Sequence, residues 1–141
     1  MRYVLDSNIA IAALSGVEAV RSRLAHVPSS EVGIPIVAVA ELTFGAYKSA
    51  RRDANLQRIA GLRRSITVLN LDDGVVDLYG STRAALERRG IVKSDFDLLI
   101  ACTALGQDAV LVTNDQGLLD VEIEGLRTEN WLAGGPGPKR E

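Results

Sequence analysis

The chain has 141 residues, of which 47% are hydrophobic, and this length suits one domain with a single core. We expect a cytoplasmic protein without a disulfide or membrane span. Asp6 and Asn8 interrupt any N-terminal signal sequence, Cys102 is the only cysteine, and no apolar run approaches the roughly 20 residues of a transmembrane helix. The net charge of −2 excludes strong non-specific binding of nucleic acid through bulk positive charge.

Short apolar segments alternate with segments of helical length along the chain. The expected strands cover residues 3–5, 32–34, 66–71, 110–112 and 126–128. The expected helices cover residues 8–14, 17–26, 36–50, 54–64, 75–89 and 95–105, and residues 28–30 are a loop. This alternation predicts a parallel sheet covered by helices on both faces. We expect one domain over residues 1–132 and a disordered tail over residues 133–141, which is rich in glycine and proline.

Four acidic residues end or interrupt apolar segments: Asp6, Glu41, Asp97 and Asp115. Asp6 directly follows the first strand, and ligands of open α/β sheets bind outside the carboxyl ends of the strands. Four carboxylates in one cleft would repel each other unless cations were present. Oxygen ligands suit magnesium or manganese, so the four acids predict a site for Mg²⁺ or Mn²⁺.

Each acid also has a simpler structural explanation. Asp6 could cap the following helix, Asp97 could belong to a capping box that begins at Ser94, and Asp115 could be a turn residue. Glu41 is harder to explain in this way, because it interrupts a helix that is apolar nearly all round. Burying an unpaired carboxylate costs several kcal/mol, which a metal ion or a basic partner would remove. A surface position beside small alanines is the alternative.

Several polar residues lie next to these acids. They could orient water or bind phosphate oxygens, although capping and turn formation explain them equally well: Ser7, Asn8, Thr113 and Asn114. Lys93, just before the helix at residues 95–105, could contact a phosphate or be fully solvated.

Five short motifs occur in a fixed order along the chain. They are Leu5-Asp6-Ser7-Asn8, Ala40-Glu41-Leu42 with Gly45, Asp97-Leu98-Leu99-Ile100-Ala101, Val112-Thr113-Asn114-Asp115 and Glu129-Asn130-Trp131. Together they resemble PIN domains, specifically the VapC-type ribonuclease toxins of bacterial and archaeal toxin–antitoxin pairs. The resemblance covers about residues 2–132.

The resemblance implies a three-layer fold, with a parallel sheet of four to five strands between helices, often as a homodimer. It implies that the metal-binding active site is formed by Asp6, Glu41, Asp97 and Asp115. It also implies cleavage of single-stranded or loop regions of RNA, and an antitoxin that covers the acidic cleft and carries a DNA-binding portion. The chain departs from many relatives at Lys93-Ser94, where they have Ile-Gly or similar, and at the additional acid Asp95. These departures concern substrate contacts rather than the four acids.

We expect Asp6 and Asp97 to be the principal ligands of Mg²⁺ or Mn²⁺. Asp115 and Glu41 would complete the site, bind a second ion or orient the attacking water, whose pKa a bound ion lowers. A receiver-like phosphorylation domain is the first alternative, but Lys93 precedes a helix rather than ending a strand. The others are a non-catalytic PIN-like scaffold that binds RNA or protein, and a PIN nuclease of ordinary RNA processing.

Overall fold

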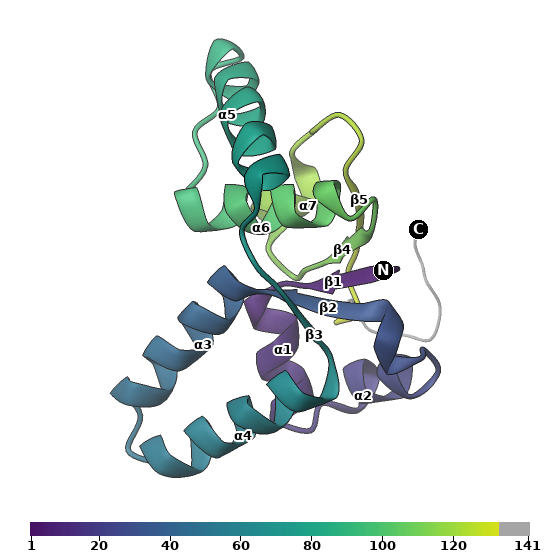
Figure 1. Ribbon diagram of the computed structural model, residues 1–141, viewed down its shortest axis with the longest axis vertical. Helices are drawn as coiled ribbons and strands as arrows, with labels where there is room; N and C mark the ends of the chain where they lie inside the picture. The colour runs from purple at the N-terminus through teal and green to yellow at the C-terminus, as the bar shows by residue number, and fades with distance from the viewer. Residues whose placement is uncertain (133–141) are drawn as a thin grey trace.

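The computed structural model describes residues 1–132, which form a five-stranded sheet with helices packed around it (Figure 1). All neighbouring strands are parallel, in the order β3-β2-β1-β4-β5. The strands are β1 (Tyr3–Leu5), β2 (Val32–Pro35), β3 (Thr67–Leu69), β4 (Val110–Val112) and β5 (Arg127–Glu129). The predicted parallel α/β architecture is therefore confirmed. The tail that we expected to be disordered lies outside the described residues.

Helices connect successive strands throughout the described part of the chain. They are α1 (Ser7–Leu14), α2 (Glu18–Ala25), the 3-10 helix η1 (Ser29–Glu31), α3 (Ile36–Lys48), α4 (Arg52–Ser65), α5 (Asp73–Arg88), α6 (Asp95–Gly106) and α7 (Gln116–Asp120). In Figure 1, α1 to α4 occupy the lower half of the view and α5 to α7 the upper half, with the strands between them. Over residues 1–132, no helix has the length and apolar character needed to cross a membrane.

The central strand β1 sends alternate side chains into two cores, as the two-residue period of a strand requires. Val4 belongs to a cluster that includes Ile100 of α6 and apolar residues of α3 and α4. Tyr3 and Leu5 belong to a second cluster with α1, α2 and Trp131. Trp131 is buried, and its ring meets the Tyr3 ring edge-on with 5.1 Å between centroids. Burial on both faces fixes β1, and with it the residue that follows, Asp6.

The expected elements were wrong in three places. We expected no helix after β4, but α7 forms there, because the side chain of Asp115 accepts a hydrogen bond from the backbone N–H of Gly117 at 2.9 Å and caps it. The third strand is shorter than residues 66–71, because the N–H of Ile66 still donates to the helical carbonyl of Leu62. The loop expected at residues 28–30 contains part of η1. The remaining ends shift by one or two residues.

Candidate active site

Asp6 lies at the carboxyl end of the central strand and is 4% exposed. Its backbone N–H donates to the carbonyl of Val112 at 2.9 Å, which continues the pairing of β1 with β4. Its carboxylate accepts two hydrogen bonds of 2.7 Å, from the N–H of Ser7 to Oδ1 and from the hydroxyl of Thr113 to Oδ2. Each oxygen therefore has one fixed donor and keeps further lone-pair capacity for a ligand.

Thr113 connects two of the predicted acids. Its hydroxyl donates to Asp6 and accepts a hydrogen bond from the backbone N–H of Asp115 at 3.0 Å. The whole residue is buried, with 0% exposure. We predicted a substrate contact for Thr113 from the sequence, whereas its buried position favours a role in orienting Asp6 and the loop after β4.

Asp97 and Asp115 both lie at helix N-termini, as the simpler explanations required. The N–H of Asp97 donates to Oγ of Ser94, the N-cap residue of α6, at 3.1 Å. This contact uses the backbone of Asp97 and not its carboxylate. Asp115 caps α7 through Oδ1 alone. Capping is therefore compatible with a second role for both carboxylates.

The four acids come from distant parts of the chain but influence each other electrostatically. Burial raises the pKa of Asp6, and the charge of Asp115 raises it further. Burial also raises the pKa of Glu41, to which the charges of Asp6 and Asp97 add. The pKa of Asp97 is raised by burial and then by Asp115 and Asp6. The prediction that these side chains meet at the carboxyl edge of the sheet thus has physical support, while their catalytic roles stay a prediction.

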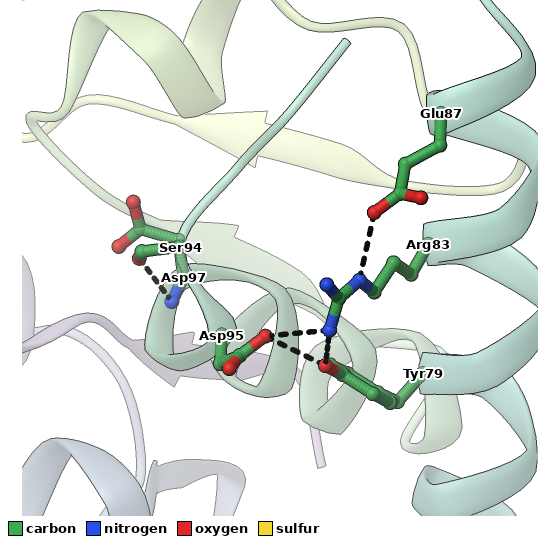
Figure 2. Close-up of polar contacts among 6 residues, drawn as sticks. All are labelled: Tyr79, Arg83, Glu87, Ser94, Asp95 and Asp97. Atoms are coloured by element: carbon green, nitrogen blue, oxygen red, sulfur yellow. Dashed lines mark hydrogen bonds and ion pairs between the residues drawn. The ribbon is translucent and has the colours of Figure 1, made fainter.

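Asp95, the additional acid beside Asp97, points away from this cluster. The hydroxyl of Tyr79 donates to its Oδ1 at 2.6 Å, and Arg83 donates to the same oxygen at 3.1 Å. Figure 2 shows Asp95 directed toward α5, which carries Tyr79 and Arg83, while the side chain of Asp97 points away from α5. Asp95 therefore links α6 to α5 and does not add a fifth carboxylate to the site.

The other predicted polar residues support the loops around the acids. The N–H of Asn114 donates to Oδ1 of Asn8 at 3.3 Å, and Nδ2 of Asn130 donates to Oδ1 of Asn114 at 3.1 Å. A hydrogen bond with Ser7 opposes the rise in the pKa of Glu41. Asn114 is exposed and Ser7 and Asn8 are half-buried, so these three remain candidates for substrate contacts. We did not predict a role in the site for Asn130, which the sequence showed only as part of the closing motif.

The donor set of the cluster fits a hard divalent cation. Its ligand atoms are all carboxylate oxygens, which Mg²⁺ and Mn²⁺ prefer. Burial is the main cause of the raised pKa values, and repulsion between the acids, which a cation would relieve, adds to it. Within residues 1–132, no three histidine, cysteine or acidic side chains already stand at metal-binding spacing. Binding an ion would therefore require the carboxylates to draw together.

A cavity of about 270 Å³ lies between α1, α3 and α4, next to Glu41. Glu41 lines it, together with the apolar side chains of Ile11, Leu14, Leu42 and Ile59. Arg58 also lines the cavity, whose wall therefore has one acidic and one basic side chain beside its apolar surface. Glu41 is therefore the acid that borders a largely apolar cavity.

The sequence and structure place this chain in a known class of proteins. Residues 3–124 match the family model described as the PIN domain. The chain belongs to the PIN-domain family. The fold and the family predicted from the sequence motifs are thus confirmed.

Within this family, the similarity is to VapC ribonucleases. The tRNA(fMet)-specific endonuclease VapC of Shigella flexneri is 34% identical over 132 residues, which cover 93% of this chain and 98% of that protein. Ribonuclease VapC2 of Rickettsia felis is 29% identical over 133 residues, which cover 93% and 98% respectively.

Two solved toxin–antitoxin structures have closely similar folds. The crystal structure of VapBC2 from Rickettsia felis, bound to a DNA fragment from their promoter, matches with a TM-score of 0.85 and 28% identity, covering 93% of this chain and 99% of that one. The crystal structure of DNA-bound VapBC from Salmonella typhimurium matches with a TM-score of 0.85 and 30% identity, covering 93% and 98%.

Proposed function

We propose that this protein is a metal-dependent endoribonuclease and the toxin of a toxin–antitoxin pair. One observation carries the proposal: the charges of neighbouring acids, among them Asp115, add to the larger effect of burial in raising the pKa values of Asp6, Glu41 and Asp97. The relatives are named as ribonucleases, and the similar structures are toxin–antitoxin complexes, which supports the same function here.

Asp6 and Asp97 are the ligands that we assign first to Mg²⁺ or Mn²⁺. Asp6 is held in place, since its two oxygens accept hydrogen bonds from Ser7 at the start of α1 and from Thr113 just after β4. Asp97 projects from the first turn of α6, and its carboxylate is not used in the cap of that helix. When bound, the metal supplies an activated water and stabilises negative charge on the phosphate.

Glu41 and Asp115 have supporting roles in this proposal. Each would complete the ligand set or accept a proton from the attacking water, since a carboxylate beside the reaction centre can act as a general base. This role suits Glu41 in particular, whose pKa is raised by burial and by two neighbouring acids.

We propose that the partner of this chain is a small antitoxin that covers the acidic cluster. The cavity beside Glu41 offers an apolar wall from Ile11, Leu14 and Ile59, next to the Glu41 carboxylate. An antitoxin segment with apolar residues and one Arg or Lys would fill the cavity and pair with Glu41, Asp6 or Asp97. A guanidinium or ammonium group there would compete with the metal for the same oxygens. Assembly of the toxin as a homodimer, in the cytoplasm, is part of the same proposal.

RNA cleavage by the purified chain tests the nuclease activity. Initiator tRNA is the first substrate to try, because two of the relatives are named for tRNA(fMet). We expect cleavage with Mg²⁺ or Mn²⁺, none with excess chelator, and recovery when the metal is restored. Cleavage that is equally fast in chelator would contradict metal dependence.

Growth after induced expression tests the toxin role. Expression of this chain should arrest growth, Asp6→Asn should not, and co-expression of the small open reading frame next to its gene should restore growth. Normal growth with soluble, RNA-cleaving protein would instead indicate a PIN nuclease of ordinary RNA processing.

A further inference from the structure

Lys93 places a positive charge at the edge of the acidic cluster. It is half-buried, in the segment just before α6, and its Nζ donates to the carbonyl of Gly117 in α7 at 3.0 Å. A methyl group added at Gly117 would stand 3.0 Å from Nζ and 3.2 Å from Oδ1 of Asp115. The ammonium group therefore lies close to the N-terminus of α7, where Asp115 forms the cap.

The same ammonium group also acts on the neighbouring acid of α6. Its charge is one of the influences that lower the pKa of Asp97, against the larger effect of burial. Lys93 thus lies near both Asp97 and Asp115, two of the acids assigned to the metal site. An ammonium group has three N–H donors. Among contacts within residues 1–132, Nζ uses one of them, for Gly117.

A substrate phosphate next to this cluster needs a cation to offset the carboxylates. Asp6, Glu41, Asp97 and Asp115 repel a phosphodiester, and a bound metal ion offsets only part of their charge. The described residues include two lysines, Lys48 and Lys93. Lys48 lies in the last turn of α3, with its Nζ 5.2 Å from the centre of the Phe44 ring. Lys93 is the one held beside the acids.

We propose that Lys93 binds a phosphate group of the RNA substrate at the edge of the acidic cluster. The proposal rests on the ribonuclease function proposed above. The bond to Gly117 holds the ammonium group in place before RNA arrives and leaves its other two N–H donors for the phosphate. Lys93 is then a substrate-binding residue, which accounts for a lysine at a position where we expected altered substrate contacts.

RNA binding by the inactive Asp6→Asn protein provides the test. A short single-stranded RNA is titrated in Mg²⁺ at several salt concentrations, with and without Lys93→Gln. Loss of one charge-assisted phosphate contact should weaken binding roughly tenfold at low salt. It should also reduce the slope of log affinity against log salt by about 0.7, the value for one phosphate on a single strand. Lys93→Arg, which keeps the charge, should retain most of the affinity and slope.

Lys48→Gln in the same background is the matched control, and it should leave affinity and slope nearly unchanged. Thermal melting separates binding from a structural role, since a lysine that only tethers α7 would lower the melting temperature without changing the salt slope. If wild-type protein cleaves RNA but Lys93→Gln binds like Lys48→Gln, this inference fails and the nuclease function stands. If the wild type neither binds nor cleaves RNA, both fail. Weaker binding to the antitoxin alone would assign Lys93 to the protein partner and overturn the proposal.

Discussion

At the scale of single residues, the hydroxyl of Thr113 is the main structural support of the proposed site. It bridges the buried carboxylate of Asp6 and the backbone of Asp115, so the ends of two neighbouring strands are joined by one oxygen atom. Its hydrogen bond also lowers the pKa of Asp6, against the larger upward effect of burial. Without it, the carboxylate would be buried with one oxygen unsatisfied.

We predict that Thr113→Val lowers the free energy of unfolding by about 1–3 kcal/mol at neutral pH, the typical effect of leaving a buried polar group without its partner. Val has nearly the same shape, so the loss reports the hydroxyl rather than packing. The loss should shrink in acid, where the Asp6 carboxyl is protonated. Urea denaturation at two pH values measures both effects.

Thr103→Val is the control for this experiment. Thr103 is also buried, but its hydroxyl donates only to the carbonyl of Leu99, one turn earlier in α6. We expect it to cost less than about 1 kcal/mol, because that carbonyl keeps its helical partner. Equal effects of the two substitutions would contradict the special role of Thr113.

Asp6→Asn separates activity from stability. It keeps the shape of the side chain but removes the charge, so cleavage should fall at least about 100-fold, which corresponds to several kcal/mol of lost charge stabilisation. Without metal, the Asp6→Asn variant should melt at a higher temperature than the wild type. Burial raises the pKa of the Asp6 carboxyl, so its charged form opposes folding at neutral pH. Calorimetry and RNA cleavage measure the two effects. Full activity of the Asp6→Asn variant, in buffer freed of contaminating metal ions, would exclude Asp6 from the active site.

At the scale of elements, three of the four acids lie at helix N-termini. Asp6 caps α1, Asp115 caps α7, and Asp97 lies in the first turn of α6. The positive end of a helix dipole stabilises carboxylates by about 0.3–1 kcal/mol each, which partly offsets their mutual repulsion. The helices thus help to gather like charges, and their N-termini determine where the carboxylates lie.

Ser94→Ala should affect both stability and activity through α6. Loss of the N-cap hydroxyl should cost about 0.5–2 kcal/mol and loosen the first turn that carries Asp97. We therefore expect weaker Mn²⁺ binding and slower cleavage in addition to a lower melting temperature. Calorimetric Mn²⁺ titration measures the binding.

Asp72→Ala removes the corresponding cap from α5, where the side chain of Asp72 accepts a hydrogen bond from Val75 at 2.9 Å. It should lower stability to a similar extent and leave Mn²⁺ affinity unchanged. If both variants lose affinity equally, the effect of Ser94 is global rather than local.

The sequence was sufficient to predict the sheet, because apolar runs such as Val110–Val112 have the length and composition of buried strands. It also singled out the four acids as candidate ligands, since charged residues rarely interrupt such runs without a reason, and their role in the site stays a prediction. It could not predict α7, whose five residues carry no periodic pattern and whose N-terminus also resembles a turn. Nor could it show that Asp95 points toward α5, because side-chain direction depends on Tyr79 and Arg83, which are distant in sequence.

At the scale of the whole molecule, the acidic cluster opposes the usual effect of pH on stability. Asp6, Glu41 and Asp97 have pKa values raised in the folded state, so the folded protein binds protons more tightly than the unfolded chain does. Their contribution to stability is greatest in acid and is lost as the pH rises through the folded pKa values. A bound divalent ion would remove this loss.

We predict that metal-free wild-type protein loses stability relative to Asp6→Asn as the pH rises from about 4 to 7. Saturating Mg²⁺ should restore the wild type, by about 2.7 kcal/mol at 100 times the dissociation constant, and should have a much smaller effect on the variant. Scanning calorimetry over this range, with and without metal, gives both comparisons. A difference between the proteins that does not change with pH would contradict the proposed charge cluster.

The single tryptophan gives the protein an intrinsic fluorescence signal from one known position. Trp131 meets the Tyr3 ring edge-on and donates from Nε1 to Oε1 of Glu129 at 2.9 Å, while the Arg23 guanidinium lies 5.0 Å from the centre of its ring. All indole emission therefore comes from one environment, in contact with the strand that ends at Asp6. Fluorescence can thus follow unfolding without a label. A change in this fluorescence on adding an ion or a partner would show that binding near Asp6, at the carboxyl end of β1, alters the surroundings of Trp131.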